Sequence, residues 1–328
     1  MHFLHPSSLQ SLKVGRTPIS LFLFCILAVG MAGHLPAQST NAPAKFVELR
    51  QKFTTKLIRK ESAGEKTQPP PKDIFNLVQY ESPVGKLDAY VGIDPKDGKK
   101  HPAIIWLVGG FSNSIGDEAW TKGPADNDQS ATAFREAGMI MMYPSLRGGN
   151  ANPGFKEGLY GEVDDVLAAL KYLKSLSYVD PQRIYLGGHS TGGTLALLVA
   201  ETTQDFRAIL AFGPVHSAIS YGKDVMPFDT TDKTEMYMRA PVLWLQDITT
   251  PTFVIEGTGR GNVEPLRLMK RHNKNPKVSF FEIEGATHFN LLRPLTKFMA
   301  EKFVADKGPT VDLTITSDEL NKAFHSGT

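Results

Sequence analysis

The sequence predicts an α/β fold in which a mostly parallel sheet carries helices on both faces. Continuous apolar runs, as expected for buried parallel strands, occur at residues 103–108, 139–143, 206–212, 252–255 and 278–283. Segments with helical spacing of apolar residues alternate with these runs, most clearly at 161–176 and 291–304. Because each return crosses one face of the sheet, such alternation places parallel strands side by side.

A hairpin and a short helix are predicted ahead of this alternation. Residues 76–80 and 86–93 alternate between polar and apolar side chains and are joined by the turn sequence Ser82-Pro83-Val84-Gly85. We therefore expect an antiparallel N-terminal hairpin at one edge of the sheet. Residues 45–60 have the spacing of an amphipathic helix, whose apolar face would contain Phe46, Leu49, Phe53 and Leu57.

Composition argues against several classes of partner and cofactor. The chain has 328 residues and a net charge of only +2, and no basic stripe favours binding to nucleic acid. No spacing of histidines and carboxylates suggests a metal site, and no glycine-rich fingerprint suggests a nucleotide. We therefore expect no cofactor and no metal, and a small molecule or short peptide as substrate.

The N-terminus has the pattern of a secretory signal. Lys13 and Arg16 precede an apolar run at residues 19–32, and Leu35-Pro36-Ala37 offers small residues for cleavage after Ala37. The run of about 14 residues is shorter than the roughly 20 that span a bilayer. We predict that residues 1–37 are removed and that the protein is secreted or periplasmic, without stable membrane insertion. An uncleaved anchor is the alternative. Cys25, the only cysteine, lies in this segment, so the mature chain would have no disulfide.

The rest of the chain is predicted to form one main domain. Residues 38–72 would be a linker and the short helix, 73–305 the α/β domain, and 306–328 a C-terminal tail. Residues 214–248 show no clear period, and they form either a cap that shapes a substrate pocket or a structural helix insertion. The tail contains Thr316-Ser317-Asp318-Glu319, a capping-box pattern that predicts a final helix.

The sequence Gly188-His189-Ser190-Thr191-Gly192 lies between a predicted strand and a predicted helix at residues 194–200. In this context the G-x-S-x-G pattern is typical of a nucleophile elbow. Its turn is so tight that the residues two before and two after the serine must be small. The serine hydroxyl is then exposed at the carboxyl end of the strand, so Ser190 is the predicted nucleophile.

A serine hydroxyl needs a base, and its tetrahedral intermediate needs backbone donors. His288 lies in a small-residue loop after the last predicted strand, late in the chain, where this architecture places its base. The predicted donors are the amide of Thr191, next to the nucleophile, and the amide of Gly110 or Phe111, after the strand at 103–108.

The chain resembles the α/β-hydrolase superfamily, most closely its prolyl-oligopeptidase-like (peptidase S9) and dienelactone-hydrolase-like branch. The resemblance covers residues 75–304 and implies an α/β-hydrolase fold. It is carried by Val108-Gly109-Gly110-Phe111, Tyr143-Pro144-Ser145-Leu146-Arg147-Gly148-Gly149, Val179-Asp180-Pro181-Gln182-Arg183-Ile184, Gly188-His189-Ser190-Thr191-Gly192-Gly193 and Gly285-Ala286-Thr287-His288.

The chain departs from this family's pattern at two positions. Val108 stands where the family usually has a histidine before the glycine pair. In the run Gly257-Thr258-Gly259-Arg260-Gly261-Asn262-Val263, arginine occupies the position of the triad acid. The nearby candidates for that acid are Glu264, which we rank first, then Asn262 and Glu256, with Asp224 more remote.

The sequence as a whole predicts a secreted serine hydrolase that forms an acyl-enzyme on Ser190. We expect ester rather than amide or peptide cleavage, because after removal of the predicted signal only about 40 residues would precede the domain, too few for a propeller of several roughly 40-residue blades. The alternative is a catalytically weakened binding protein that keeps the fold, suggested by Arg260 in the acid position.

Overall fold

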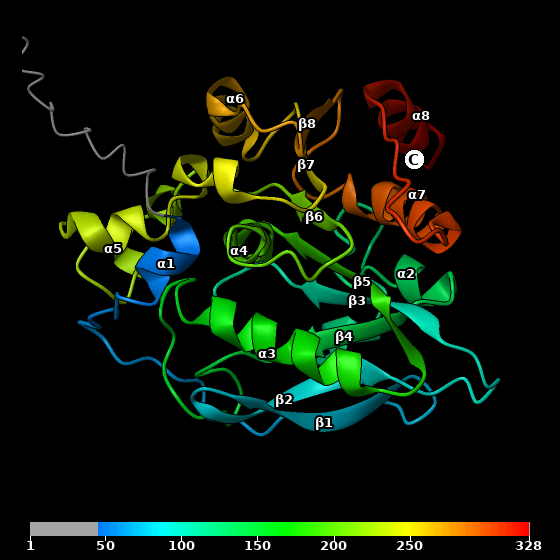
Figure 1. Cartoon of the computed structure of the whole chain (residues 1–328), viewed down its shortest axis with the longest axis horizontal. Helices are drawn as coiled ribbons and strands as arrows, with labels where there is room; N and C mark the ends of the chain where they lie inside the picture. Colours follow the sequence, from blue (N-terminus) through cyan, green and yellow to red (C-terminus); the bar gives the residue numbers. More distant parts are fainter. Residues whose placement is uncertain (1–44, 328) are drawn as a thin grey trace, which may run out of the picture. The chain divides into compact units, whose positions relative to one another are not determined.

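The computed structural model describes residues 45–327, so the predicted signal peptide and Cys25 lie outside the described residues. One eight-stranded sheet has the order β1-β2-β4-β3-β5-β6-β7-β8 (Figure 1). Its strands are β1 (Phe75–Ser82), β2 (Gly85–Gly92), β3 (His101–Leu107), β4 (Ile140–Pro144), β5 (Val179–His189), β6 (Ile209–Phe212), β7 (Thr252–Gly257) and β8 (Val278–Ile283).

The predicted fold class is confirmed. Strands β1 and β2 form an antiparallel hairpin at the sheet edge, and β2 also pairs antiparallel with β4. All other neighbouring strands run parallel. The carboxyl ends of β3, β5, β6, β7 and β8 therefore meet at one edge of the sheet, where open α/β sheets bind their ligands.

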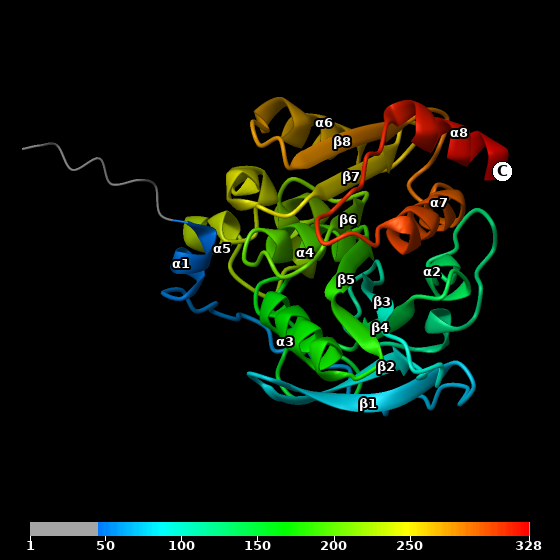
Figure 2. The ribbon, with the colours of Figure 1, turned by 45° about the vertical axis from the view of Figure 1, so that its right-hand side comes forward.

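Helices cover both faces of this sheet (Figure 2). The α-helices are α1 (Phe46–Arg50), α2 (Ala133–Glu136), α3 (Glu162–Ser175), α4 (Thr191–Ala200), α5 (Lys233–Tyr237), α6 (Val263–His272), α7 (Leu292–Ala305) and α8 (Ser317–Gly327). Short 3₁₀ helices are η1 (Asp117–Ala119), η2 (Ala218–Tyr221), η3 (Lys223–Val225), η4 (Pro241–Leu243) and η5 (Leu245–Asp247).

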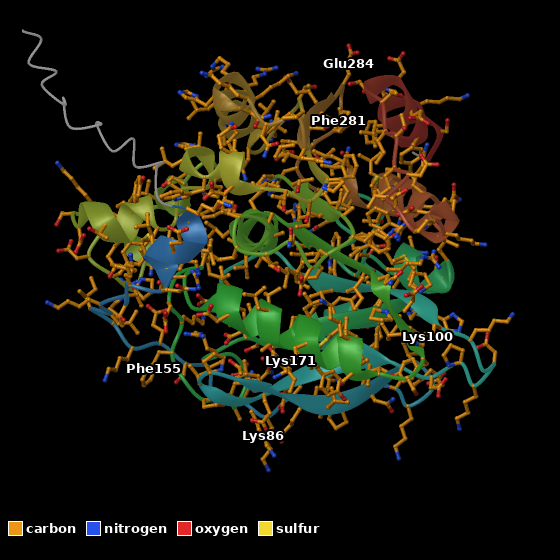
Figure 3. The ribbon with its side chains drawn as sticks, in the orientation of Figure 1. Lys86, Lys100, Phe155, Lys171, Phe281 and Glu284 are labelled. Carbon is orange, nitrogen blue, oxygen red and sulfur yellow. The ribbon has the colours of Figure 1, made fainter. Side chains whose placement is uncertain are left out.

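The alternating faces of the strands fill two apolar cores. Ile105 and Leu107 of β3 join the core that α3, α4 and α6 cover, whereas Ile104 and Trp106 face the core under α2, α7 and α8. Every residue of α4 is buried, which explains why its sequence is apolar all round. Charged side chains such as Lys86, Lys100, Lys171 and Glu284 are exposed and project outward (Figure 3).

The N-terminal helix is shorter than predicted. Only Phe46–Arg50 is helical, and the apolar residues that suggested a longer helix contact different elements. The ring centroid of Phe46 lies 5.1 Å from that of Trp244, that of Phe53 lies 5.2 Å from that of Tyr160, and Leu57 forms a β-bridge with Phe228. Because these partners are spread along the fold, residues 51–66 run over it as an extended segment, which we call the strap.

The predicted C-terminal capping box is present at the start of α8. The amide of Glu319 donates to Thr316 Oγ1 (3.2 Å), and the amide of Thr316 donates to Glu319 Oε2 (2.9 Å). Within residues 45–327, no helix is long and apolar enough to cross a membrane, and no cluster of three metal-ligating side chains occurs.

Candidate active site

Ser190 alone forms the turn between β5 and α4. Its backbone has φ +56° and ψ −114°, a conformation that costs a non-glycine residue of the order of 1–3 kcal/mol. The flanking glycines have no space for a side chain: a Cβ on Gly188 would lie 2.4 Å from the carbonyl oxygen of Gly192, and one on Gly192 would lie 2.2 Å from that of Leu107. The turn thus has the geometry that the elbow pattern predicts.

Hydrogen bonds on both sides hold this strained turn. The amide of Ser190 donates to the carbonyl oxygen of Phe212 at the end of β6 (2.8 Å). The carbonyl oxygen of Ser190 accepts from the amide of Thr194 (2.9 Å) and from Thr194 Oγ1 (3.2 Å). The backbone of Ser190 is therefore fixed by the neighbouring strand and by the first turn of α4.

His288 lies in the loop between β8 and α7, with its ring bound to a carboxylate. Its Nδ1 is 2.7 Å from Oε2 of Glu256, whose side chain is fully buried at the end of β7. A carboxylate only accepts hydrogen bonds, so this contact places the hydrogen of the neutral ring on Nδ1. The lone pair is then on Nε2, as a general base requires.

Two further donors satisfy the buried Glu256 carboxylate. The amide of Gly257 donates to Oε1 (2.7 Å), and the amide of Asn262 donates to Oε2 (3.0 Å). A buried charge is tolerated when it is hydrogen-bonded in this way. The side chain of Asn262 donates to the carbonyl oxygen of Gly213 (2.7 Å). The backbone amide of Asn262 thus supports the Glu256 carboxylate, and its side-chain amide supports the adjacent backbone at Gly213. The side chain of Asn262 does not orient the His288 ring.

Two glycines make room for the His288 side chain. A Cβ on Gly213 would lie 2.4 Å from Cε1 of His288, and one on Gly261 would lie 2.6 Å from its Cβ. Gly213 directly follows Phe212, whose carbonyl oxygen accepts from the amide of Ser190. The two predicted residues Ser190 and His288 therefore meet at the same pair of residues at the end of β6.

The predicted oxyanion donors are the amides of Thr191, Gly110 and Phe111. They follow the carboxyl ends of β5 and β3, at the edge of the sheet where Ser190 lies. The amide of Thr191 is the first of α4 and has no carbonyl one turn earlier to accept from it. Within residues 45–327, the amides of Gly110 and Phe111 donate to no other protein group, whereas the amide of Gly109 donates to Gln129 Oε1 (3.3 Å). Thr191 Oγ1 donates to the carbonyl oxygen of Gly110 (2.5 Å), which ties the two donor loops together.

The structure corrects the ranking of the acid candidates. Glu264 lies in the first turn of α6, a helix that the sequence did not indicate, and its exposed carboxylate pairs with Arg267 Nη1 (2.7 Å). Negative charge is favourable in this first turn because of the helix dipole. Arg260 is exposed too, and its backbone contacts the histidine loop: it forms a β-bridge with Thr287, and its carbonyl oxygen accepts from the amide of His288 (2.8 Å). Glu256 is the carboxylate that contacts His288.

A sequence signal for Glu256 was present. It is a carboxylate that directly follows the apolar run Phe253-Val254-Ile255 and precedes Gly257, at the carboxyl end of a buried strand. The family's spacing directs attention to the loop four residues later. The charged residue near the end of an otherwise apolar strand was the better indicator, because that strand ends beside the loop that carries His288.

His189, the variable residue of the elbow, supports the loop that carries His288 through a hydrogen bond to its backbone. Its side chain is buried, its Nε2 donates to the carbonyl oxygen of His288 (2.9 Å), and the two ring centroids are 4.4 Å apart. Burial, and secondarily the neighbouring charge of His288, lower the pKa of His189 to about 3. His189 is therefore neutral at physiological pH and acts as a fixed hydrogen-bond donor.

Tyr221, at the end of η2, was not singled out as a site residue. Its hydroxyl lies 2.7 Å from Thr194 Oγ1, and its ring meets that of Phe111 edge-on at 5.5 Å. Burial raises the pKa of Tyr221, and hydrogen bonding with the Thr194 and Ser190 side chains opposes this shift. Tyr221 is thus a neutral phenol beside the elbow.

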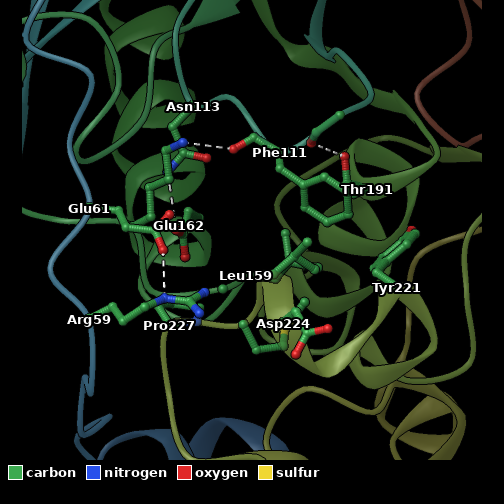
Figure 4. Close-up of a pocket in the computed structure, with 15 residues that line it drawn as sticks. Arg59, Glu61, Phe111, Asn113, Leu159, Glu162, Thr191, Tyr221, Asp224 and Pro227 are labelled. Carbon is green, nitrogen blue, oxygen red and sulfur yellow. Dashed lines mark hydrogen bonds and ion pairs between the residues drawn. The ribbon is translucent and has the colours of Figure 1, made fainter.

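A cavity of about 310 Å³ opens next to these groups (Figure 4). One side is formed by Phe111, Thr191 and Tyr221, and the opposite side by the strap residues Arg59 and Glu61 with Asn113 and Glu162. The lining also includes Gly110, Lys156, Gly158, Leu159 and residues 224–227. Part of the segment 214–248 therefore borders this cavity, while Trp244, Leu245 and Ile248 of the same segment pack into a core.

Comparisons with known proteins agree with this fold. Residues 126–283 match the model of the prolyl oligopeptidase family. An acylaminoacyl peptidase of Pyrococcus horikoshii is similar in structure, with a TM-score of 0.56 at 16% identity over 75% of this chain and 43% of that chain. A puromycin-hydrolyzing peptidase of Mycobacterium tuberculosis has a TM-score of 0.55 at 18% identity, over 71% of this chain and 39% of that chain.

An esterase of Pyrococcus furiosus has a TM-score of 0.57 at 17% identity, over 76% of this chain and 98% of that chain. The chain thus spans less than half of the two peptidases but nearly all of the esterase. At these identities the structural likeness establishes the fold.

Proposed function

Because the chain belongs to the prolyl-oligopeptidase-like family of α/β-hydrolase-fold serine hydrolases, we propose that it cleaves an ester bond through an acyl-enzyme on Ser190. The observation that carries this proposal is the buried pair of Glu256 and His288 beside the strained turn at Ser190. A carboxylate, a histidine and an exposed serine in this arrangement are the parts that acyl transfer requires.

The reaction follows from the roles of these groups. Ser190 Oγ attacks the ester carbonyl while His288 Nε2 takes its proton, and Glu256 stabilises the imidazolium that forms. The amides of Thr191 and of Gly110 or Phe111 donate to the oxyanion. His288 then gives the proton to the leaving alcohol as the ester C–O bond breaks. A water molecule, deprotonated by His288, releases the acid and restores Ser190.

Ester cleavage is our first choice of reaction, with amide or peptide cleavage second. The near-complete match to the Pyrococcus furiosus esterase supports ester substrates, and the peptidases matched over less than half their length support the second candidate. The binding-protein alternative depended on Arg260 in the acid position. Since Glu256 supplies a carboxylate to His288, that argument loses its basis.

We also propose that the protein acts outside the cytoplasm, as a secreted or periplasmic enzyme. The support for this location is the signal-like pattern of residues 1–37. N-terminal sequencing of the protein from the extracellular or periplasmic fraction would test it. A mature chain that starts at Gln38 is expected, and a full-length chain retained in the membrane fraction would contradict the proposal.

The enzymatic proposal is tested with a fluorophosphonate probe and a matched pair of substrates. We expect the chain to be labelled and the Ser190→Ala variant not to be. We also expect 4-nitrophenyl butyrate to be cleaved faster than butyryl-4-nitroanilide, which has the same acyl group. A folded protein that is never labelled would refute the hydrolase, and comparable turnover of both substrates would favour the amide-cleaving candidate.

A further inference from the structure

The cavity beside Ser190 contains a carboxyl group with an unused acceptor. Glu162 begins α3, is 2% exposed and lines the cavity. Its Oε1 accepts from the amide of Glu157 (2.7 Å) and from Asn113 Nδ2 (3.1 Å). Its Oε2 is buried and has no hydrogen-bond partner. A buried carboxyl oxygen without a donor is costly, so this atom marks a place that a ligand's donor group would occupy.

The cations of the same cavity already have partners. Arg59 Nε donates to Glu61 Oε1 (2.9 Å), and Lys156 Nζ donates to the carbonyl oxygen of Phe111 (2.9 Å). Figure 4 shows Arg59, Glu61, Asn113 and Glu162 together on one wall of the cavity. Among the acceptors of this wall, Glu162 Oε2 is the one that is both buried and without a donor within residues 45–327.

A second carboxylate lies at the exposed edge of the cavity. Asp224 lines it from η3, and no hydrogen bond or ion pair joins its side chain to another group within residues 45–327. The lining of the cavity also includes the apolar side chains of Leu159, Val225 and Met226. A ligand with an apolar body and a cationic group matches this lining, because its charge would be paired and its body desolvated.

We propose that this cavity binds a substrate group that carries a protonated amine, with Glu162 Oε2 as the buried acceptor and Asp224 as the carboxylate at the entrance. The inference rests on the proposed function, since it assigns part of the substrate for the same site. Burial raises the pKa of Glu162, and a bound ammonium group would oppose this effect by stabilising the charged carboxylate.

The test is calorimetric titration of the Ser190→Ala chain with hexylamine, hexanol and hexanoate, which share one apolar body. A charged hydrogen bond to Oε2 should make hexylamine bind at least about tenfold more tightly than hexanol. Hexanoate is the critical comparison, because the Lys156 ammonium group lines the same cavity and could bind a carboxylate instead. Equal affinities for amine and alcohol, or a preference for hexanoate, would overturn the proposal.

Glu162→Gln is the decisive variant, because it keeps the Oε1 acceptor and replaces Oε2 by a donor of similar size. We expect it to weaken hexylamine at least about tenfold and to leave hexanol unchanged. Glu61→Gln is the matched control within the same cavity and should keep hexylamine within about threefold, since its exposed ion pair contributes little. A Glu162→Gln protein that retains the amine preference would refute the role of Oε2.

Asp224→Asn provides an independent reading if Glu162→Gln does not fold, because Asp224 is exposed and without protein partners. It should weaken hexylamine about threefold and leave hexanol unchanged, and an unchanged amine affinity would exclude Asp224 from the site. Binding to Ser190→Ala needs no chemistry. If Ser190 were never labelled by the fluorophosphonate probe, the proposed hydrolase would be refuted, and the measured preference for hexylamine would still hold. If the chain showed no preference for hexylamine, the amine site would be refuted, and the proposed hydrolase would still hold.

Discussion

Glu256 Oε2 lies 2.7 Å from His288 Nδ1; Glu256 lies near the end of β7, and His288 lies in the loop that follows the neighbouring parallel strand β8. The carboxylate belongs to the strand itself rather than to the loop that follows. Its position is therefore fixed by the sheet register, in which Glu256 is paired with Glu282. A triad acid held in this way would keep its geometry without help from the exposed residues 258–261.

Gly213→Ala should abolish hydrolysis because its Cβ would lie 2.4 Å from the His288 ring. Displacing the base from its partners is expected to lower kcat/KM at least about a hundredfold. Gly98→Ala is the matched control: Gly98 also has positive φ (+74°), but nothing lies within 4 Å of its added Cβ. Steady-state kinetics with 4-nitrophenyl butyrate would compare them, and equal losses in both variants would show that backbone strain alone is responsible.

His189 should make stability fall in mild acid. Its pKa drops from 6.5 in the unfolded chain to about 3 in the folded protein, so between these values the unfolded state binds more protons. The resulting stability is fully present above pH 6.5 and is lost as the pH falls toward 3. Relative to His189→Gln, the wild type should lose about 2 kcal/mol of unfolding free energy between pH 7.5 and pH 5.

Urea unfolding at the two pH values would measure this difference, since other titrating groups contribute equally to both proteins. If the wild type and His189→Gln lost the same free energy, the buried neutral histidine would be excluded.

The anchor of the strap is a buried ion pair between Glu235 of α5 and Arg239, which follows that helix. Arg239 and Glu235 are almost fully buried, 2.6 Å apart, and Glu235 also accepts from Thr55 Oγ1 (2.7 Å) and from the amide of Lys56 (2.6 Å). Glu235→Ala should cost about 3–5 kcal/mol, because it leaves the Arg239 charge buried and unpaired. It should also increase proteolysis within residues 51–66.

Removal of both charges should be less harmful than removal of one. The double variant Glu235→Leu, Arg239→Met is therefore expected to unfold at a higher urea concentration than Glu235→Ala. A double variant as unstable as the single one would mean that the strap's hydrogen bonds, and not the unpaired arginine, determine the loss.

Sequence reasoning was most accurate where local pattern and packing agree. The apolar runs predicted β3, β4, β7 and β8, and the turn sequence Ser82-Pro83-Val84-Gly85 predicted the edge hairpin, because burial on one or both faces determines those patterns. Ser190 and His288 were predicted from their positions after strands. The proximity of these two residues depends on the order of the strands in the sheet, which the alternation of strands and helices largely determines.

Long-range contacts account for what was missed. Residues 45–60 resemble one helix by spacing, but Phe46, Phe53 and Leu57 each contact a different part of the fold. Glu264 matched a loop position in the family's spacing, but α6 begins at Val263 and turns it toward Arg267. The roles of His189, Tyr221 and Glu162 depend on partners 27 to 99 residues away, which no local pattern specifies.

The central claim is that Glu256, and not Glu264, is the acid that orients His288. The most direct test compares kcat/KM for 4-nitrophenyl butyrate in Glu256→Gln and Glu264→Gln. Loss of the triad carboxylate should lower the value by about three to four orders of magnitude in Glu256→Gln, whereas Glu264→Gln should stay within about twofold of the wild type. A large loss in Glu264→Gln, with Glu256→Gln close to the wild type, would contradict the account.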